Sequence, residues 1–184
     1  MSRMMVGTEG TRLVFLRGNS ASGKSAIAAG VRERFGRGLA LVAQDNLRRI
    51  VLREHDRPGG VNIGLIDTVA RYSLDAGYHV VLEGILYADR YGQMLQELRA
   101  DHRGRTHCYY LDVPLEETVA RHATKPIAGE VGESQLREWY RPLDLLQGGI
   151  ETVIDADSTL AHTVERIMHD TDLVTLSAAA RTHR

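Results

Sequence analysis

Several common features are scarce or missing in this sequence, and each absence narrows the possible classes. The 184 residues include one cysteine, Cys108, which cannot form an intramolecular disulfide or a thiolate metal cage. Lys and Arg total 23 against 24 Asp and Glu, so no global field draws the chain to long nucleic acid or to an anionic membrane. No apolar run approaches the ~20 residues that span a bilayer, and residues 1–10 do not form a signal sequence. These absences predict a cytoplasmic protein that does not bind membranes.

Other absences concern metal sites, guanine recognition and domain organisation. The eight histidines show no H-E-x-x-H or comparable spacing, so no structural zinc site is predicted. An N-K-x-D sequence, with which GTPase switches read guanine, is also missing, although this does not establish adenine specificity. Without internal repeats, low-complexity tracts or linkers, residues 1–184 are expected to form a single domain, frayed at 1–10 and 171–184.

Apolar runs alternate with helical patterns along the chain, which favours an α/β fold. The runs lack strict polar alternation, so we expect parallel strands that are buried on both faces. The expected strands are 11–16, 39–43, 79–84, 106–112 and 151–156. The expected helices are 24–35, 45–54, 62–76, 88–100, 115–123 and 134–146.

The segment between the first strand and the first helix matches G-x-x-x-x-G-K-[ST] in full. Glycines at both ends let the backbone curl with its N–H groups pointing toward a phosphate, and the following helix adds its positive N-terminal dipole. The lysine is expected to reach the β- and γ-phosphates and the serine hydroxyl to bind magnesium. The alternative is a glycine-rich turn that binds nothing. The predicted cradle consists of Gly18, Asn19, Ser20, Ala21, Ser22, Gly23, Lys24 and Ser25.

With this motif, D-x-x-R at 45–48 and V-V-L-E-G at 80–84, the sequence resembles the P-loop kinase group. It is similar in particular to zeta-toxin, chloramphenicol phosphotransferase and polynucleotide kinase families. The resemblance implies a five-stranded parallel sheet in the order 2-3-1-4-5, with helices on both faces and a helical lid at about 121–146. It also implies that ATP and Mg²⁺ are bound, with no dedicated metal site beyond the nucleotide-bound magnesium.

Asp45 follows the second expected strand, so its carboxylate should project from the carboxyl edge of the sheet, where ligands bind in such folds. There it can accept the proton of an attacking hydroxyl as a general base. An N-cap for the following helix is the alternative role, and the two can coexist. Arg48 completes D-x-x-R, which in polynucleotide 5′-hydroxyl kinases holds an acceptor phosphate; the alternative is a solvated arginine on a basic helix.

Two carboxylates at the ends of expected strands are candidates for a position near the magnesium ion. Glu83 ends an apolar strand and resembles the carboxylate on the third strand of the related kinases, where it can hold a magnesium-bound water or an acceptor hydroxyl. Asp112 ends the fourth expected strand, but Pro114 and the helix behind it favour a structural cap. We therefore favour Glu83.

Cations over the transferring phosphoryl group are expected from the lid. Arg121 lies on the helix after the fourth strand, where the resemblance implies a lid arginine. A solvated surface position is the favoured role for Lys125, Arg137 and Arg141. Trp139 can stack on an acceptor ring, although a helical aromatic is more often part of a core.

These features predict a phosphotransferase that moves the γ-phosphoryl group of ATP to a hydroxyl of a small-molecule acceptor. One alternative is a polynucleotide 5′-hydroxyl kinase that binds a nucleic-acid 5′ end, which the near-zero net charge disfavours. Another is a nucleotide-binding regulatory NTPase that acts through a partner. The sequence does not identify the acceptor.

Overall fold

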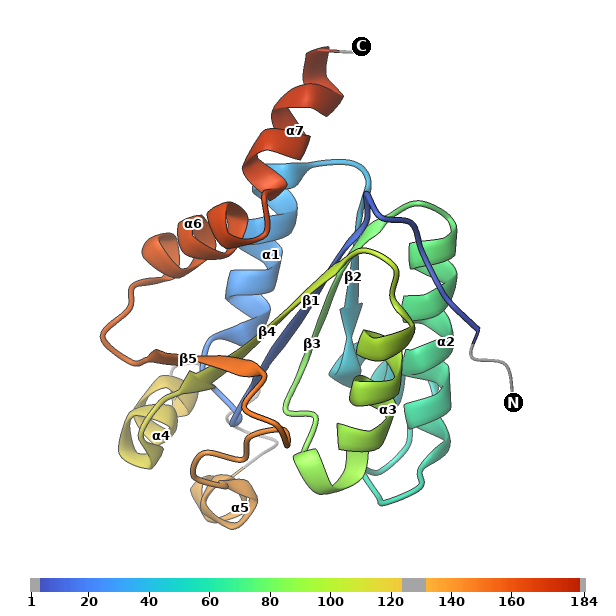
Figure 1. Ribbon diagram of the computed structural model, residues 1–184. Coiled ribbons are helices and arrows are strands. Elements are labelled where there is room, and N and C mark those ends of the chain that lie inside the picture. The colour runs from blue at the N-terminus through green and yellow to red at the C-terminus, as the bar shows by residue number, and fades with distance from the viewer. Residues whose placement is uncertain (1–3, 124–131, 183–184) are drawn as a thin grey trace.

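A computed structural model describes residues 4–123 and 132–182, with side chains up to residue 178. Five parallel strands form one sheet in the order β2-β3-β1-β4-β5 (Figure 1). The predicted strand order is therefore confirmed. The strands are β1 (Arg12–Gly18), β2 (Leu39–Ala43), β3 (His79–Gly84), β4 (Arg105–Asp112) and β5 (Glu151–Asp155).

Helices cover both faces of the sheet (Figure 1). One face carries α2 (Val61–Asp75) and α3 (Ala88–Asp101); the other carries α1 (Lys24–Phe35), α6 (Leu160–Asp170) and α7 (Leu173–Thr182). The short helices α4 (Leu115–Ala123) and α5 (Glu133–Trp139) lie beyond the carboxyl ends of the strands. This is the place expected for a lid.

The central strand shows why its sequence lacks polar alternation. Leu13 and Phe15 join the core between the sheet and α2 and α3. Val14 and Leu16 join the core on the opposite face, against α1 and α6. Successive side chains of a strand point to opposite faces, so a strand between two helical layers carries apolar residues on both faces.

Two expected helices are shorter in the structure. The segment predicted as a helix over 45–54 forms only the π-helix η1 (Asn46–Val51), none of whose residues is buried. Leu47 packs against the core, but Ile50 and Val51 are exposed, so little apolar burial stabilises a longer helix there. The helix predicted over 134–146 ends at Trp139, since Tyr140 is extended and Pro142 soon follows.

The chain ends also differ from the expectation of frayed segments. Val6 forms a bridge with His102 and is 4 % exposed. At the other end, Leu173 is fully buried at the start of α7. These two apolar side chains attach the segments near the chain ends to the core, which the sequence of those segments did not predict.

Candidate functional site

The phosphate loop, residues 18–25, connects β1 to α1 in a conformation that requires its two glycines. Gly18 has φ +149° and a Cβ there would lie 2.7 Å from the carbonyl oxygen of Leu111. Gly23 has φ +104° just before α1. L-residues with side chains rarely adopt these angles, so the glycines allow the loop to curl at both ends.

Lys24 and Ser25 make contacts that order this loop. The Lys24 Nζ atom donates to the Asn19 carbonyl oxygen at 2.7 Å and to the Ser22 hydroxyl at 3.3 Å, so the side chain spans the loop. The Ser25 hydroxyl donates to Glu83 Oε1 at 3.1 Å. The structure thus brings together the predicted magnesium serine and the predicted strand-end carboxylate, whereas Asp112 does not line the same cleft.

The residue after Glu83 must be a glycine, Gly84, because the Gln44 side chain leaves no room for a Cβ. A Cβ on Gly84 would lie 2.6 Å from Cβ of Gln44 and would also overlap Gln44 Oε1. Without it, the buried Gln44 crosses the end of β3, where Oε1 accepts from the Leu86 amide at 3.1 Å and Nε2 donates to the Tyr91 hydroxyl at 2.8 Å. Gln44 precedes Asp45 in the chain, so these contacts fix the backbone beside the predicted base.

Asp45 lies at the carboxyl edge of the sheet, as predicted, and its side chain is 65 % exposed. It makes no capping hydrogen bond to η1, so the structure does not support the alternative that Asp45 is an N-cap. Oδ1 instead accepts from Arg48 Nη2 at 2.7 Å, and Arg48 Nη1 donates to the Glu54 carbonyl oxygen at 3.0 Å. Arg48 therefore orients the carboxylate in this structure.

Arg121 reaches the phosphate loop from α4. Its Nη1 atom donates to the Ser22 carbonyl oxygen at 3.2 Å, and Nη2 pairs with Glu117 one turn earlier. Arg137 instead bonds Glu116 and Glu133 outside the cleft, while Lys125 lies outside the described residues. The structure thus places the predicted lid arginine beside the loop.

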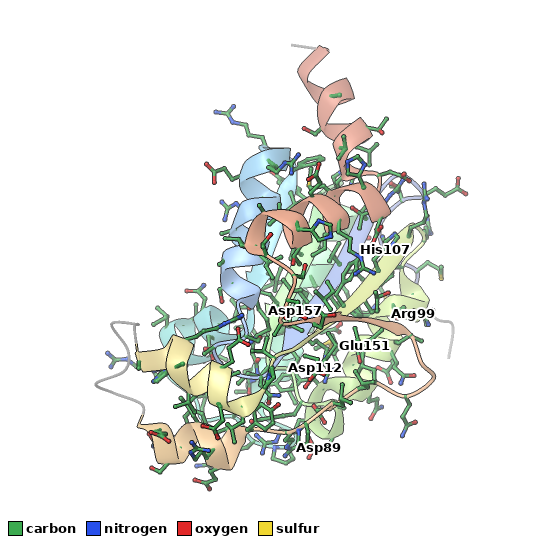
Figure 2. The ribbon with its side chains drawn as sticks, turned by 90° about the vertical axis from the view of Figure 1, so that its left-hand side faces the viewer. Asp89, Arg99, His107, Asp112, Glu151 and Asp157 are labelled. Carbon is green, nitrogen blue, oxygen red and sulfur yellow. The ribbon has the colours of Figure 1, made fainter. Side chains whose placement is uncertain are left out.

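A cleft of about 1070 Å³ joins these groups. Its lining includes residues of the phosphate loop, Glu83 and Arg121, together with residues at η1 and in the loop that follows, among them Asp45, Arg48 and Arg53. Figure 2 shows Asp89 and Asp112 in the lower half of the molecule, on the side of α4 and α5.

Four other residues of the cleft include Trp139, which the sequence offered as a stacking residue, and two, Tyr87 and Arg90, that it did not predict. We call these four, Tyr87, Arg90, Trp139 and Arg141, the aromatic wall. The Tyr87 ring lies between two guanidinium groups, 4.9 Å from that of Arg90 and 4.1 Å from that of Arg141. Tyr87 lies three residues after the end of β3 and Arg90 lies in the first turn of α3, so their nearness to the carboxyl end of a strand is the signal that could have predicted them.

No protein-family model and no curated protein matches the sequence. Solved structures do match: a sugar kinase from Janibacter sp. HTCC2649 has a TM-score of 0.66 at 20 % identity, covering 91 % of this chain and 98 % of its own. The APS kinase of Mycobacterium tuberculosis in complex with AMPPNP and APS gives 0.66 at 20 % identity, over 93 % and 99 %. A gluconokinase from Sinorhizobium meliloti 1021 gives 0.61 at 17 % identity, over 98 % and 99 %. The chain has the P-loop kinase fold.

In this P-loop kinase fold a polar cluster centred on the buried Tyr91 includes two residues of the cleft lining, Gln44 and Asp56. The Tyr91 hydroxyl donates to Asp56 Oδ1 at 2.5 Å and accepts from Gln44 and from Asn62 Nδ2. Burial, followed by the bond to Asp56, raises the pKa of Tyr91. The phenol therefore stays protonated at neutral pH and holds the loop before α2 against α3.

Two further observations complete the description of this P-loop kinase fold. Among residues 4–123 and 132–182, no group of three or more His, Cys, Asp or Glu side chains gathers in a way that could hold a metal ion by itself. Within the same residues, no helix has the length and apolar character needed to span a membrane.

Proposed function

We propose that the protein is a cytoplasmic ATP- and Mg²⁺-dependent phosphotransferase that transfers the γ-phosphoryl group to a hydroxyl of a small-molecule acceptor. One observation carries this proposal: residues of the phosphate loop and Asp45 line the same cleft. A donor phosphate bound at the loop would thus share the cleft with an acceptor hydroxyl bound at Asp45.

The residues around the loop suit a nucleotide triphosphate and its metal ion. The curled backbone directs amides toward bound phosphates, and the α1 N-terminus and Lys24 add positive charge. Ser25 and Glu83, whose oxygens lie 3.1 Å apart, would hold Mg²⁺ directly or through its waters. The ion, when bound, neutralises charge on the phosphate oxygens.

In the transfer, the acceptor oxygen forms a bond to the γ-phosphorus while the bond from that phosphorus to the bridging oxygen breaks, which releases ADP. Asp45 accepts the hydroxyl proton, because its exposed carboxylate is held through Oδ1 by Arg48 and keeps Oδ2 for the acceptor. Arg121, already beside the loop at Ser22, stabilises charge on the migrating phosphoryl group.

The test is transfer of label from γ-labelled ATP, with Mg²⁺, to a panel of sugars, nucleosides, antibiotics and other hydroxyl compounds. We expect Asp45→Asn to lower kcat by ~10²–10⁴-fold with little change in nucleotide affinity. Asp67→Asn is the matched control, because Asp67 also pairs with an arginine on a helix, Arg71, but outside the cleft. Unchanged kcat in Asp45→Asn would remove Asp45 as the base, and no transfer to any acceptor would favour a regulatory NTPase.

The contact between Asp45 and Arg48 also favours a second candidate, a polynucleotide 5′-hydroxyl kinase, because it realises the D-x-x-R pattern in space. Binding of a short 5′-hydroxyl oligonucleotide at increasing salt separates the two activities. Affinity that falls steeply with salt, together with label on the 5′ end, would establish this candidate. Transfer to small acceptors alone would exclude it.

A further inference from the structure

The side chain of Asn19, the second residue of the phosphate loop, is paired with the main chain of Arg141. Its Nδ2 atom donates to the Arg141 carbonyl oxygen at 2.8 Å, and its Oδ1 atom accepts from the Arg141 amide at 2.9 Å. The residue is only 3 % exposed. A carboxamide offers one donor and one acceptor at the spacing of a peptide group, so Asn19 binds residue 141 as a neighbouring strand would.

Two further contacts attach the same segment to the sheet. The Tyr110 hydroxyl lies 3.3 Å from both Asn19 Nδ2 and the Arg141 carbonyl oxygen. Arg17, on β1, donates to the Asp144 carbonyl oxygen at 2.9 Å and pairs with Glu151, the first residue of β5, which is labelled in Figure 2. The chain that leaves α5 is therefore held by the strand and loop that also form the phosphate site.

Arg141 is itself part of the aromatic wall. Its guanidinium group lies over the Tyr87 ring and pairs with Asp89 at 2.8 Å. The Tyr87 hydroxyl in turn donates to the carbonyl oxygen of Trp139 at 2.6 Å, two residues before Arg141. Fixing the Arg141 backbone thus fixes the guanidinium and indole that line the cleft away from the phosphate loop.

We propose that Asn19 is a positioning residue for the acceptor side of the cleft, although it lies within the nucleotide-binding motif. Through the Arg141 backbone it holds the aromatic wall at a set distance from the donor phosphates. The proposal rests on the proposed function, because it assigns the aromatic wall to acceptor binding. According to this proposal, the Asn19 side chain affects acceptor binding, whereas the loop backbone, Lys24 and Ser25 bind the nucleotide.

The experiment compares Asn19→Ala, which removes both hydrogen bonds to Arg141 and the bond to Tyr110, with Asn19→Ser, which keeps a neutral hydroxyl in the same place. Gln93→Ala is the control, because it removes a carboxamide whose bond to Glu97 lies on the exposed face of α3. Kd for a non-hydrolysable ATP analogue is measured by calorimetry, and KM is measured for the acceptor found with the wild-type enzyme. Trp139, the one tryptophan of the chain, reports on the wall through acrylamide quenching of its fluorescence.

We expect the Kd of the analogue to stay within about threefold of wild type, while the acceptor KM rises about tenfold or more in Asn19→Ala and less in Asn19→Ser. Trp139 should become more accessible to acrylamide in the same order, and Gln93→Ala should match wild type in all three readouts. Equal losses in analogue and acceptor affinity, or an unchanged acceptor KM, would overturn the proposal.

The two proposals fail differently. If the wild-type protein transfers label to no acceptor, the proposed function fails, while Trp139 quenching and hydrogen exchange of the Arg141 amide still test whether Asn19 holds the wall. If transfer occurs but Asn19→Ala changes neither quenching nor acceptor KM, the positioning role alone is refuted. Should Asn19→Ala not fold, Asn19→Ser carries the same test, because it fills part of the space without burying a charge.

Discussion

Replacing Gly84 with alanine tests whether the end of β3 positions the predicted base. The new Cβ would lie 2.6 Å from Cβ of Gln44, a distance that rotation of the glutamine side chain cannot relieve. The Gln44 backbone must therefore move, which strains the core and weakens the bonds to Leu86 and Tyr91. Overpacking costs about 1–3 kcal/mol, and each lost hydrogen bond costs about 1 kcal/mol. We expect Gly84→Ala to lower the free energy of unfolding by ~2–4 kcal/mol.

Asp45 follows Gln44 directly, so the same displacement should reduce phosphoryl transfer. We expect kcat/KM for the acceptor to fall by roughly 10–100-fold, while nucleotide affinity stays near wild type, because the nearest atoms that the added Cβ meets belong to Gln44 and Leu86. Urea unfolding measures the stability and labelled-ATP transfer measures the activity.

Gly64→Ala is the matched control, since a Cβ on Gly64 meets no atom within 4 Å. Alanine in a helix is favoured over glycine, so this variant should gain ~0.5–1 kcal/mol and keep full activity. If Gly84→Ala behaved like Gly64→Ala in both assays, the assigned role of Gly84 would be refuted.

Three other outcomes are expected. Glu151→Gln leaves the fully buried Arg17 guanidinium without its main charged partner and should lower the free energy of unfolding by ~3–5 kcal/mol in urea titrations; a loss below about 1 kcal/mol would show that Asp144 compensates. Burial, followed by the charge of Arg12, lowers the pKa of His102 to about 4 from its ordinary 6.5. The unfolded chain thus binds more protons between these values, and stability should fall by roughly 1–3 kcal/mol as pH falls from 6.5 to 4. His102→Gln should show a shallower decline over the same range, and equal slopes would contradict the assignment. Glu83→Gln should raise the Mg²⁺ concentration needed for half-maximal transfer by about 10-fold, and an unchanged Mg²⁺ requirement would move the metal site elsewhere.

Several parts of the candidate site could be predicted because each depends on the end of a strand. Ser25 and Glu83 meet because β1 and β3 are neighbours with their carboxyl ends at one edge. Asp45 reaches that edge in the same way from β2. The Arg121 position followed from the family resemblance, since a helix after β4 passes over the phosphate loop. Because the strands are parallel, residues that follow neighbouring strands meet at one edge of the sheet, and the sequence can therefore predict them.

The length of η1 and the aromatic wall could not be predicted in this way. The hydrophobic pattern of 45–54 does not reveal that none of its residues is buried in η1. Arg141 belonged to an expected helix and was interpreted as a solvated side chain, yet it stacks on Tyr87 from another part of the chain. Such contacts depend on how loops pack against each other, for which no local periodicity exists.

The sequence by itself determined the phosphate loop, the strand–helix alternation and the two-sided burial of the sheet, because each depends on local backbone preference or on side-chain period. Only the tertiary structure decided what surrounds that loop. Asn19 and Arg141 are 122 residues apart, and Tyr91 and Asp56 are 35 apart. A hydrogen bond between such positions leaves no local pattern in the sequence, since it forms only after the sheet has brought its loops together at one edge.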